Sequence, residues 1–139
     1  MRITLFGIDD ANRLAAEIRP RLVKLRAQKR EFERLDTRLA VLHMATEGAA
    51  EGNPDAVELA TIDRKRRRLG AVIAGALGEL GEQGAIVKDL ELGLCDFYTL
   101  RGDRLVFLCW RMDEPEVAHW HGLEDGFAGR RPLKGAELG

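Results

Sequence analysis

The chain has 139 residues, of which 45% are hydrophobic and 32% are charged, so its composition excludes a disordered tail. This length predicts a single domain over residues 1–139. The formal net charge is -1, and no global field therefore attracts nucleic acid or an anionic membrane. No apolar run reaches the ~20 residues that cross a bilayer, so we expect no membrane partner.

The first predicted elements are a short strand and a long helix. Residues 2–6 are typical of a strand, and Asp9 or Asp10 can cap the helix that follows. Pro20 predicts either a kink or a short first helix followed by a long one. Apolar residues recur at every seventh position, which indicates a coiled-coil packing seam, at Ile18, Leu25, Phe32 and Leu39.

A second helix start is marked by Asn53, Pro54 and Asp55, which supply a capping side chain, a favoured first residue and an early acid. This helix is expected to pair antiparallel with the first, so that residues 9–82 form a helical hairpin. Its nearly apolar segment, residues 69–80, is expected to be buried on more than one side. Because the arms are too long for one small globule to cover, we expect a homo-oligomer, a dimer through the helices.

The second helix also carries an unbroken basic run at residues 64–68. On a helix these side chains wrap around the axis and cannot form one flat basic face. No aromatic side chain is interleaved with them for base stacking. We therefore expect a solvated helix surface and no nucleic-acid partner.

From residue 83 to residue 139 the apolar pattern is that of a β-meander with a C-terminal tail. A hairpin turn is expected at Gly102 and Asp103. The predicted fold class is α+β, a long antiparallel helical hairpin plus a small antiparallel sheet of three to four strands. The expected strands are residues 86–90, 94–100, 105–112 and 117–121.

The expected strand pairing gathers metal-ligand residue types on one face of the sheet. A two-residue turn places Asp96 opposite Cys109, and a three-residue connection over 113–115 places Cys109 opposite His119. His121 then lies two residues further along the same face. Carboxylate, thiolate and imidazole are the ligands that zinc uses in proteins. These residues therefore form a candidate site for zinc or another divalent metal.

Two other interpretations use the same residues. Cys109 can be an ordinary core residue with His119 at a sheet edge, and a one-residue change in the loop moves both histidines to the other face. Cys109 can also be a thiol nucleophile with His119 as its base and Asp96 as the orienting group. A mid-strand cysteine among bulky neighbours offers little access for that chemistry.

The tail contains a candidate anion site. Arg130 and Arg131 follow a glycine-rich segment, 126–129, whose flexible backbone and neighbouring guanidiniums can surround a phosphate or a carboxylate. The alternative is that the two arginines pair with Glu124 and Asp125.

Several C-terminal motifs resemble those of a known family. They are Asp-Leu-Glu-Leu-Gly-Leu-Cys-Asp-Phe at 89–97, Val-Phe-Leu-Cys-Trp-Arg at 106–111, Glu-Pro-Glu-Val-Ala-His-Trp-His at 114–121 and Gly-Phe-Ala-Gly-Arg-Arg-Pro-Leu at 126–133. Together with the helix start at 9–12, they resemble the prokaryotic family called domain of unknown function 2203. The resemblance implies a bacterial or archaeal cytosolic protein, and no activity or ligand comes with it.

We expect a cytoplasmic protein, because Cys95 and Cys109 are too few for a disulfide scaffold and the first residues do not resemble a signal peptide. The leading functional hypothesis is a non-enzymatic assembly or interaction module with an unknown protein partner. The alternative is a metal-binding protein or metal-dependent enzyme that uses Asp96, Cys109 and His119 or His121.

Overall fold

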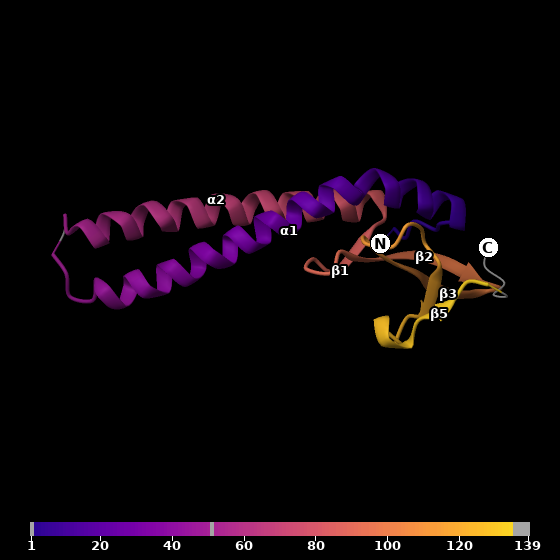
Figure 1. Ribbon diagram of the computed structural model, residues 1–139. Coiled ribbons are helices and arrows are strands. Elements are labelled where there is room, and N and C mark those ends of the chain that lie inside the picture. Colours follow the sequence, from indigo (N-terminus) through magenta and orange to yellow (C-terminus); the bar gives the residue numbers. More distant parts are fainter. Residues whose placement is uncertain (1, 51, 135–139) are drawn as a thin grey trace. The chain divides into compact units, whose positions relative to one another are not determined.

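The computed structural model describes residues 2–50 and 52–134, and it confirms the α+β class (Figure 1). Two long helices precede a five-stranded antiparallel sheet with the strand order β1-β2-β3-β4-β5. The sheet has more strands than predicted, because a short tail segment pairs with β4. The elements are α1 (Ile8–Ala45), α2 (Pro54–Gln83), β1 (Ile86–Asp89), β2 (Leu94–Arg101), β3 (Arg104–Arg111), β4 (His119–Gly122), η1 (Phe127–Gly129) and β5 (Arg131–Pro132).

The chain divides into two compact units, and α1 and α2 each contribute to both. The sheet unit consists of Met1–Arg26 and Leu77–Gly139. The hairpin unit is Ala27–Ala76. The candidate site residues all belong to the sheet unit.

In the sheet unit, one face of the sheet packs under the first half of α1, which is indigo in Figure 1. The ring of Phe6 meets Phe97 edge to face at 5.3 Å, and the Arg19 guanidinium lies 5.3 Å from the centre of the Trp110 ring. Arg19 also donates hydrogen bonds to the carbonyl oxygens of Met112 and Glu114. The side chains buried from α1 are apolar and repeat with helical spacing, namely Ala11, Leu14, Ile18, Leu22 and Leu25.

The helix starts follow the sequence. Asp10 accepts a hydrogen bond from the Gly7 amide at 3.2 Å, and Asn53 accepts one from the Asp55 amide at 2.9 Å. α1 runs through Pro20 without a break, because the apolar face on both sides of the proline is buried and compensates for the lost backbone bond. Residues 2–6 do not form the expected strand, although the Phe6 amide donates a hydrogen bond to the Tyr98 carbonyl of the sheet.

In the hairpin unit, α1 and α2 lie antiparallel and are joined by cross-helix ion pairs. Arg38 contacts Glu58 at 2.8 Å, and Arg66 contacts Asp36 at 2.9 Å. The expectation that segment 69–80 is buried on more than one side is wrong for this chain. Each helix covers only one side of its neighbour, so Val72 is 49% exposed, and the buried residue of α2 is Leu80, in the sheet unit.

No helix in the described ranges combines the length and the apolar character that crossing a membrane requires.

Candidate metal centre

Three neighbouring strands, β2, β3 and β4, position the candidate ligands. The pairing has Asp96 opposite Cys109 and Cys109 opposite His119, as the sequence predicts. The two-residue turn after Arg101 is also confirmed, with Gly102 at a φ of 64° that favours glycine. Because side chains alternate across a sheet, these residues project from the face opposite the one under α1.

The connection between β3 and β4 is longer than predicted. β3 ends at Arg111 and β4 begins at His119, so the expected start of the strand at residue 117 is wrong. The intervening loop is held by Glu114, whose amide donates to the Arg111 carbonyl and whose carboxylate accepts from the Arg111 amide, both at 2.8 Å. Trp110 donates its indole N–H to the Glu114 carbonyl at 3.1 Å. These bonds turn the chain back so that the expected register survives the longer loop.

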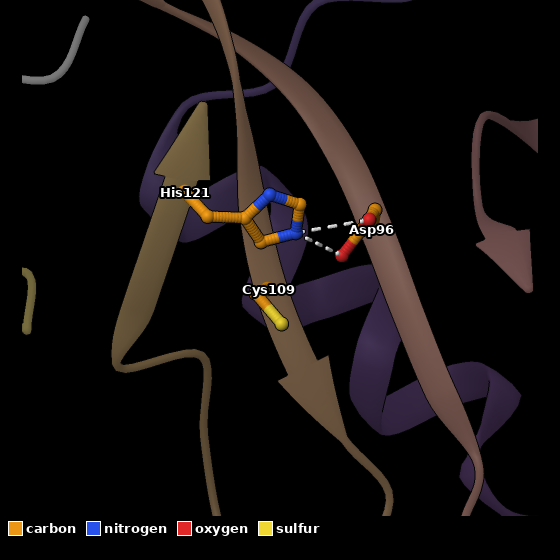
Figure 2. Close-up of side chains that lie close together, drawn as sticks. All are labelled: Asp96, Cys109 and His121. Atoms are coloured by element: carbon orange, nitrogen blue, oxygen red, sulfur yellow. Dashed lines mark hydrogen bonds and ion pairs between the residues drawn. The ribbon is translucent and has the colours of Figure 1, made fainter. Parts of the chain in front are cut away.

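The structure brings together Asp96, Cys109 and His121 (Figure 2). One ligand atom from each residue lies within 4.8 Å of the other two. The His121 ring points its Nε2 atom at Asp96, 3.1 Å from each carboxylate oxygen. The three residues are nearly sealed from solvent, with exposed fractions of 2%, 0% and 3%.

The tautomer of His121 follows from its second contact. Its Nδ1 atom lies 2.7 Å from the carbonyl oxygen of Gly122. A carbonyl oxygen only accepts hydrogen bonds, so Nδ1 carries a proton. In the neutral ring the lone pair is therefore on Nε2, the atom that faces Asp96 and Cys109. Histidines that bind metals commonly have this arrangement, with the second ring nitrogen bonded to a backbone carbonyl.

Burial controls the protonation of the other two groups. It raises the pKa of Asp96, although His121, Cys109 and Lys88 act in the opposite direction. Burial also raises the pKa of Cys109 to about 12, with the neighbouring Asp96 carboxylate adding to the shift. The thiol is thus protonated at neutral pH, which disfavours the interpretation of Cys109 as a free nucleophile.

His119 lies beside this group rather than within it. Its Nδ1 atom is 3.7 Å from a carboxylate oxygen of Glu114 and makes no hydrogen bond among the described residues. Although His119 is the strand partner of Cys109, the diagonal neighbour His121 reaches Asp96 instead. Register predicts which residues share a face, whereas the side-chain torsions decide which of them meet.

The structure separates the two arginines of the candidate anion site. Arg130 pairs with Glu114 through two contacts, one of them 3.0 Å long, and its guanidinium also lies 3.9 Å from the Cys109 sulfur. Burial opposes the ionisation of Glu114, but Arg130 holds the pKa of that carboxyl below its ordinary value. Neither Glu124 nor Asp125 is the partner of Arg130. Arg131 lies against the Trp120 ring instead, at 5.6 Å.

Glu114 and Lys88 are neighbours of the site that were not expected from the sequence. Lys88 stacks over the Phe107 ring at 5.1 Å, and Glu114 links Arg130 to the β3–β4 loop. The path of that loop depends on individual hydrogen bonds and not on periodicity, so no pattern in the sequence indicates it. Lys88 alone is suggested by its place on a strand beside β2.

A family model described as "Uncharacterized conserved protein (DUF2203)" matches residues 4–133. The matched range contains every residue of the candidate site. No curated protein and no solved structure matches the chain.

Proposed function

The chain belongs to the DUF2203 family of uncharacterised conserved proteins, and we propose that it is a metal-binding protein with one divalent ion held by Asp96, Cys109 and His121. The observation that carries this proposal is the approach of a carboxylate, a thiol and a correctly oriented imidazole nitrogen to within 4.8 Å. The ligand chemistry favours zinc, which accepts sulfur, nitrogen and oxygen together.

The spacing of the ligand atoms is close to what zinc requires. Zinc lies about 2.0 to 2.3 Å from its ligands, so the ligand atoms of a tetrahedral site are about 3.3 to 3.8 Å apart. Nε2 of His121 and the oxygens of Asp96 are already 3.1 Å apart. Side-chain torsions of Cys109 can close the remaining distance without moving the strands.

The buried groups of the site hold protons that a metal ion would displace. A protonated thiol lies beside a hydrogen-bonded carboxyl–imidazole pair among the aromatic rings of Tyr98 and Phe107. Polar groups are costly to bury there. A metal ion displaces the thiol proton and neutralises the thiolate and carboxylate together.

The burial of the site favours a structural role over catalysis. An ion at this position joins β2, β3 and β4 and has little contact with solvent. We propose a cytoplasmic location as well, because both cysteines are free, as they are under reducing conditions. A structural ion fits the hypothesis of a non-enzymatic protein that binds a protein partner through its surface.

The test is elemental analysis of untagged protein with matched variants. The wild type should contain about one zinc ion per chain. Cys109→Ser and His121→Ala should each lower the metal content at least tenfold, because each removes one of only three protein ligands.

The controls are Cys95→Ser and His119→Ala, which change the same residue types nearby. Cys95 is buried on the opposite face of the sheet, and His119 is directed toward Glu114. Both variants should retain the ion. Folded wild type that binds no zinc at a stoichiometric level, or equal loss in Cys95→Ser and Cys109→Ser, would contradict the proposal.

A second candidate function, self-assembly through the hairpin unit, is favoured by a separate observation. Both helices of the unit expose large apolar side chains, of which Met44 is 80% exposed. A second hairpin packed on this surface would complete a four-helix arrangement. The exposed residues are Val41, Met44, Val57 and Val72.

Sedimentation of the wild type tests this candidate. A homodimer should persist at micromolar concentration, and Val72→Lys should shift it toward monomer without unfolding the chain. A wild type that stays monomeric would overturn the dimer. The exposed apolar side chains would then be a binding surface for a different protein partner.

A further inference from the structure

A second polar cluster lies on the sheet face that carries Trp120, opposite the candidate metal centre. A pocket of about 160 Å³ is formed there by the β2–β3 turn, β4, β5 and the loop after β4. Three arginines from three different strands line it, namely Arg101, Arg104 and Arg131. We propose that this pocket binds the phosphoryl group of a small phosphorylated ligand.

The strand register explains why the three arginines lie on one face of the sheet. Arg101 is the direct strand partner of Arg104, and Arg131 is the direct partner of Trp120. Arg101 and Arg131 both stack on the Trp120 ring, at 4.8 Å and 5.6 Å from its centre. One buried indole thus holds two of the guanidiniums at the pocket.

The positive charge of the pocket is not balanced within the described residues. None of the three guanidinium groups has an ion pair or a hydrogen bond to a described residue, whereas the guanidinium of Arg130, next in the chain to Arg131, is paired with Glu114. Like charges directly opposite each other across two strands are destabilising. The pair formed by Arg101 and Arg104 therefore has an energetic cost that a bound anion would remove.

The one acidic residue among those that line the pocket, Asp125, offsets only part of the charge, because three arginines share the lining with a single carboxylate. A carboxylate oxygen of Asp125 accepts the Gly122 amide at 3.0 Å. This bond closes the turn after β4 and orients the carboxylate toward the backbone. A β-carbon at residue 122 would meet the same oxygen at 2.7 Å, so a side chain there would displace the Asp125 carboxylate from this position.

The guanidinium groups that line the pocket determine which class of ligand it can bind. Guanidinium groups bind phosphate oxygens with paired hydrogen bonds, and several of them together favour a doubly charged group over a carboxylate. A pocket of about 160 Å³ has room for a phosphoryl group and a few further atoms. A nucleic-acid strand is less suited, because the arginines converge on one point instead of following a backbone.

The test is calorimetric titration of the full chain with pyrophosphate and inorganic phosphate at constant ionic strength, with chloride as the reference anion. Tryptophan fluorescence gives a second readout, because Trp120 forms part of the lining. Both phosphate ligands should bind and raise the melting temperature, pyrophosphate more than phosphate. Arg101→Gln and Arg104→Gln should each weaken binding about tenfold, as expected for losing a charged hydrogen-bond donor.

The matched control is Arg68→Gln, which makes the same charge change in the hairpin unit and should leave the affinity unchanged. A loss of fold is checked by the melting temperature of each variant, and Arg104→Gln should melt no lower than the wild type because it removes a like-charge pair. Equal responses to chloride and pyrophosphate, or undiminished affinity in Arg101→Gln and Arg104→Gln, would overturn the proposal. So would tighter binding of a mixed-sequence RNA than of pyrophosphate.

Discussion

The sheet unit and the hairpin unit depart from the usual distribution of side chains in opposite ways. The sheet unit encloses Asp96 and His121 at 2% and 3% exposure, although polar groups are costly to bury. The hairpin unit exposes valines and a methionine that a covered helix pair would bury. The two proposals above account for these departures, with an ion at the buried polar groups of one unit and a second copy of the chain on the exposed apolar side chains of the other.

The two cysteines give the same contrast at the scale of single residues. Cys95 and Cys109 are both fully buried and free, and burial raises the pKa of each to about 12. Cys95 projects to the sheet face under α1, whereas Cys109 lies beside Asp96 and Arg130. The two thiols are therefore equally buried but differ in their neighbours. Only these neighbours distinguish a core thiol from a candidate metal ligand.

The largest expected effect is on thiol reactivity. A shift of the thiol pKa from 9.0 to about 12 lowers the thiolate fraction about a thousandfold at pH 8. Alkylation of the folded, metal-free protein should be slower than that of the denatured chain by about this factor. Its rate should rise about tenfold per pH unit. Rapid modification of one thiol in the folded protein, followed by mass spectrometry, would contradict the burial of both.

Loss of the buried histidine should be the most destabilising substitution at the site. In His121→Ala, Asp96 keeps its burial but loses its hydrogen-bond partner, and a buried polar group left unsatisfied costs about 1 to 3 kcal/mol, to which the cavity left by the ring adds. The cost should grow as the pH rises, because His121 lowers the pKa of Asp96 in the folded wild type, and without it the folded variant holds the Asp96 proton to a higher pH than the wild type does while the unfolded chains ionise alike.

Urea denaturation of chelator-treated protein at pH 5 and pH 8 measures this effect. His119→Ala is the control and should cost less than about 1 kcal/mol, because the His119 side chain is 29% exposed and Glu114 retains Arg130. Equal costs for the two histidines would show that the Asp96–His121 contact does not stabilise the fold.

These contrasts also show how far the sequence can be interpreted. Periodicity and the Gly102 turn suffice to predict the helical hairpin, the meander and the register of Asp96 with Cys109. They do not predict that His121 meets Asp96 while His119 turns to Glu114, because that choice depends on side-chain torsions and on a loop held by single hydrogen bonds. The extra strand β5 has two residues, too few for any pattern to indicate.

In the hairpin unit, replacing the small residue Ala74 with a larger one should change the association of two chains and leave the stability of the single chain unchanged. Ala74 is exposed in the single chain, so Ala74→Leu should change the free energy of unfolding of the monomer little. In a dimer that packs on the Ala74 face of α2, which lies about 200° around the helix axis from Val72, it should overfill the contact and cost about 1 to 3 kcal/mol. Sedimentation equilibrium gives the dissociation constant, and an unchanged value would remove this surface from the interface.

The smallest expected effect concerns the basic run of α2. Arg67 pairs with Asp63 within one helix, and its side chain is 73% exposed. Arg67→Gln should therefore alter the free energy of unfolding by no more than about 0.5 kcal/mol. A larger loss in thermal or urea denaturation would mean that the Arg67 side chain contacts more than solvent and its own helix.

Cobalt substitution tests the central claim most directly, because a cobalt–thiolate bond has its own near-ultraviolet charge-transfer absorption. Titration of metal-free protein with Co²⁺ should develop this band to one equivalent and should release the thiol proton as the ion binds. Cys95→Ser should give the wild-type spectrum, and Cys109→Ser should lose the band. A spectrum of hydrated cobalt in the folded wild type, or a band that survives in Cys109→Ser, would contradict a metal centre at Asp96, Cys109 and His121.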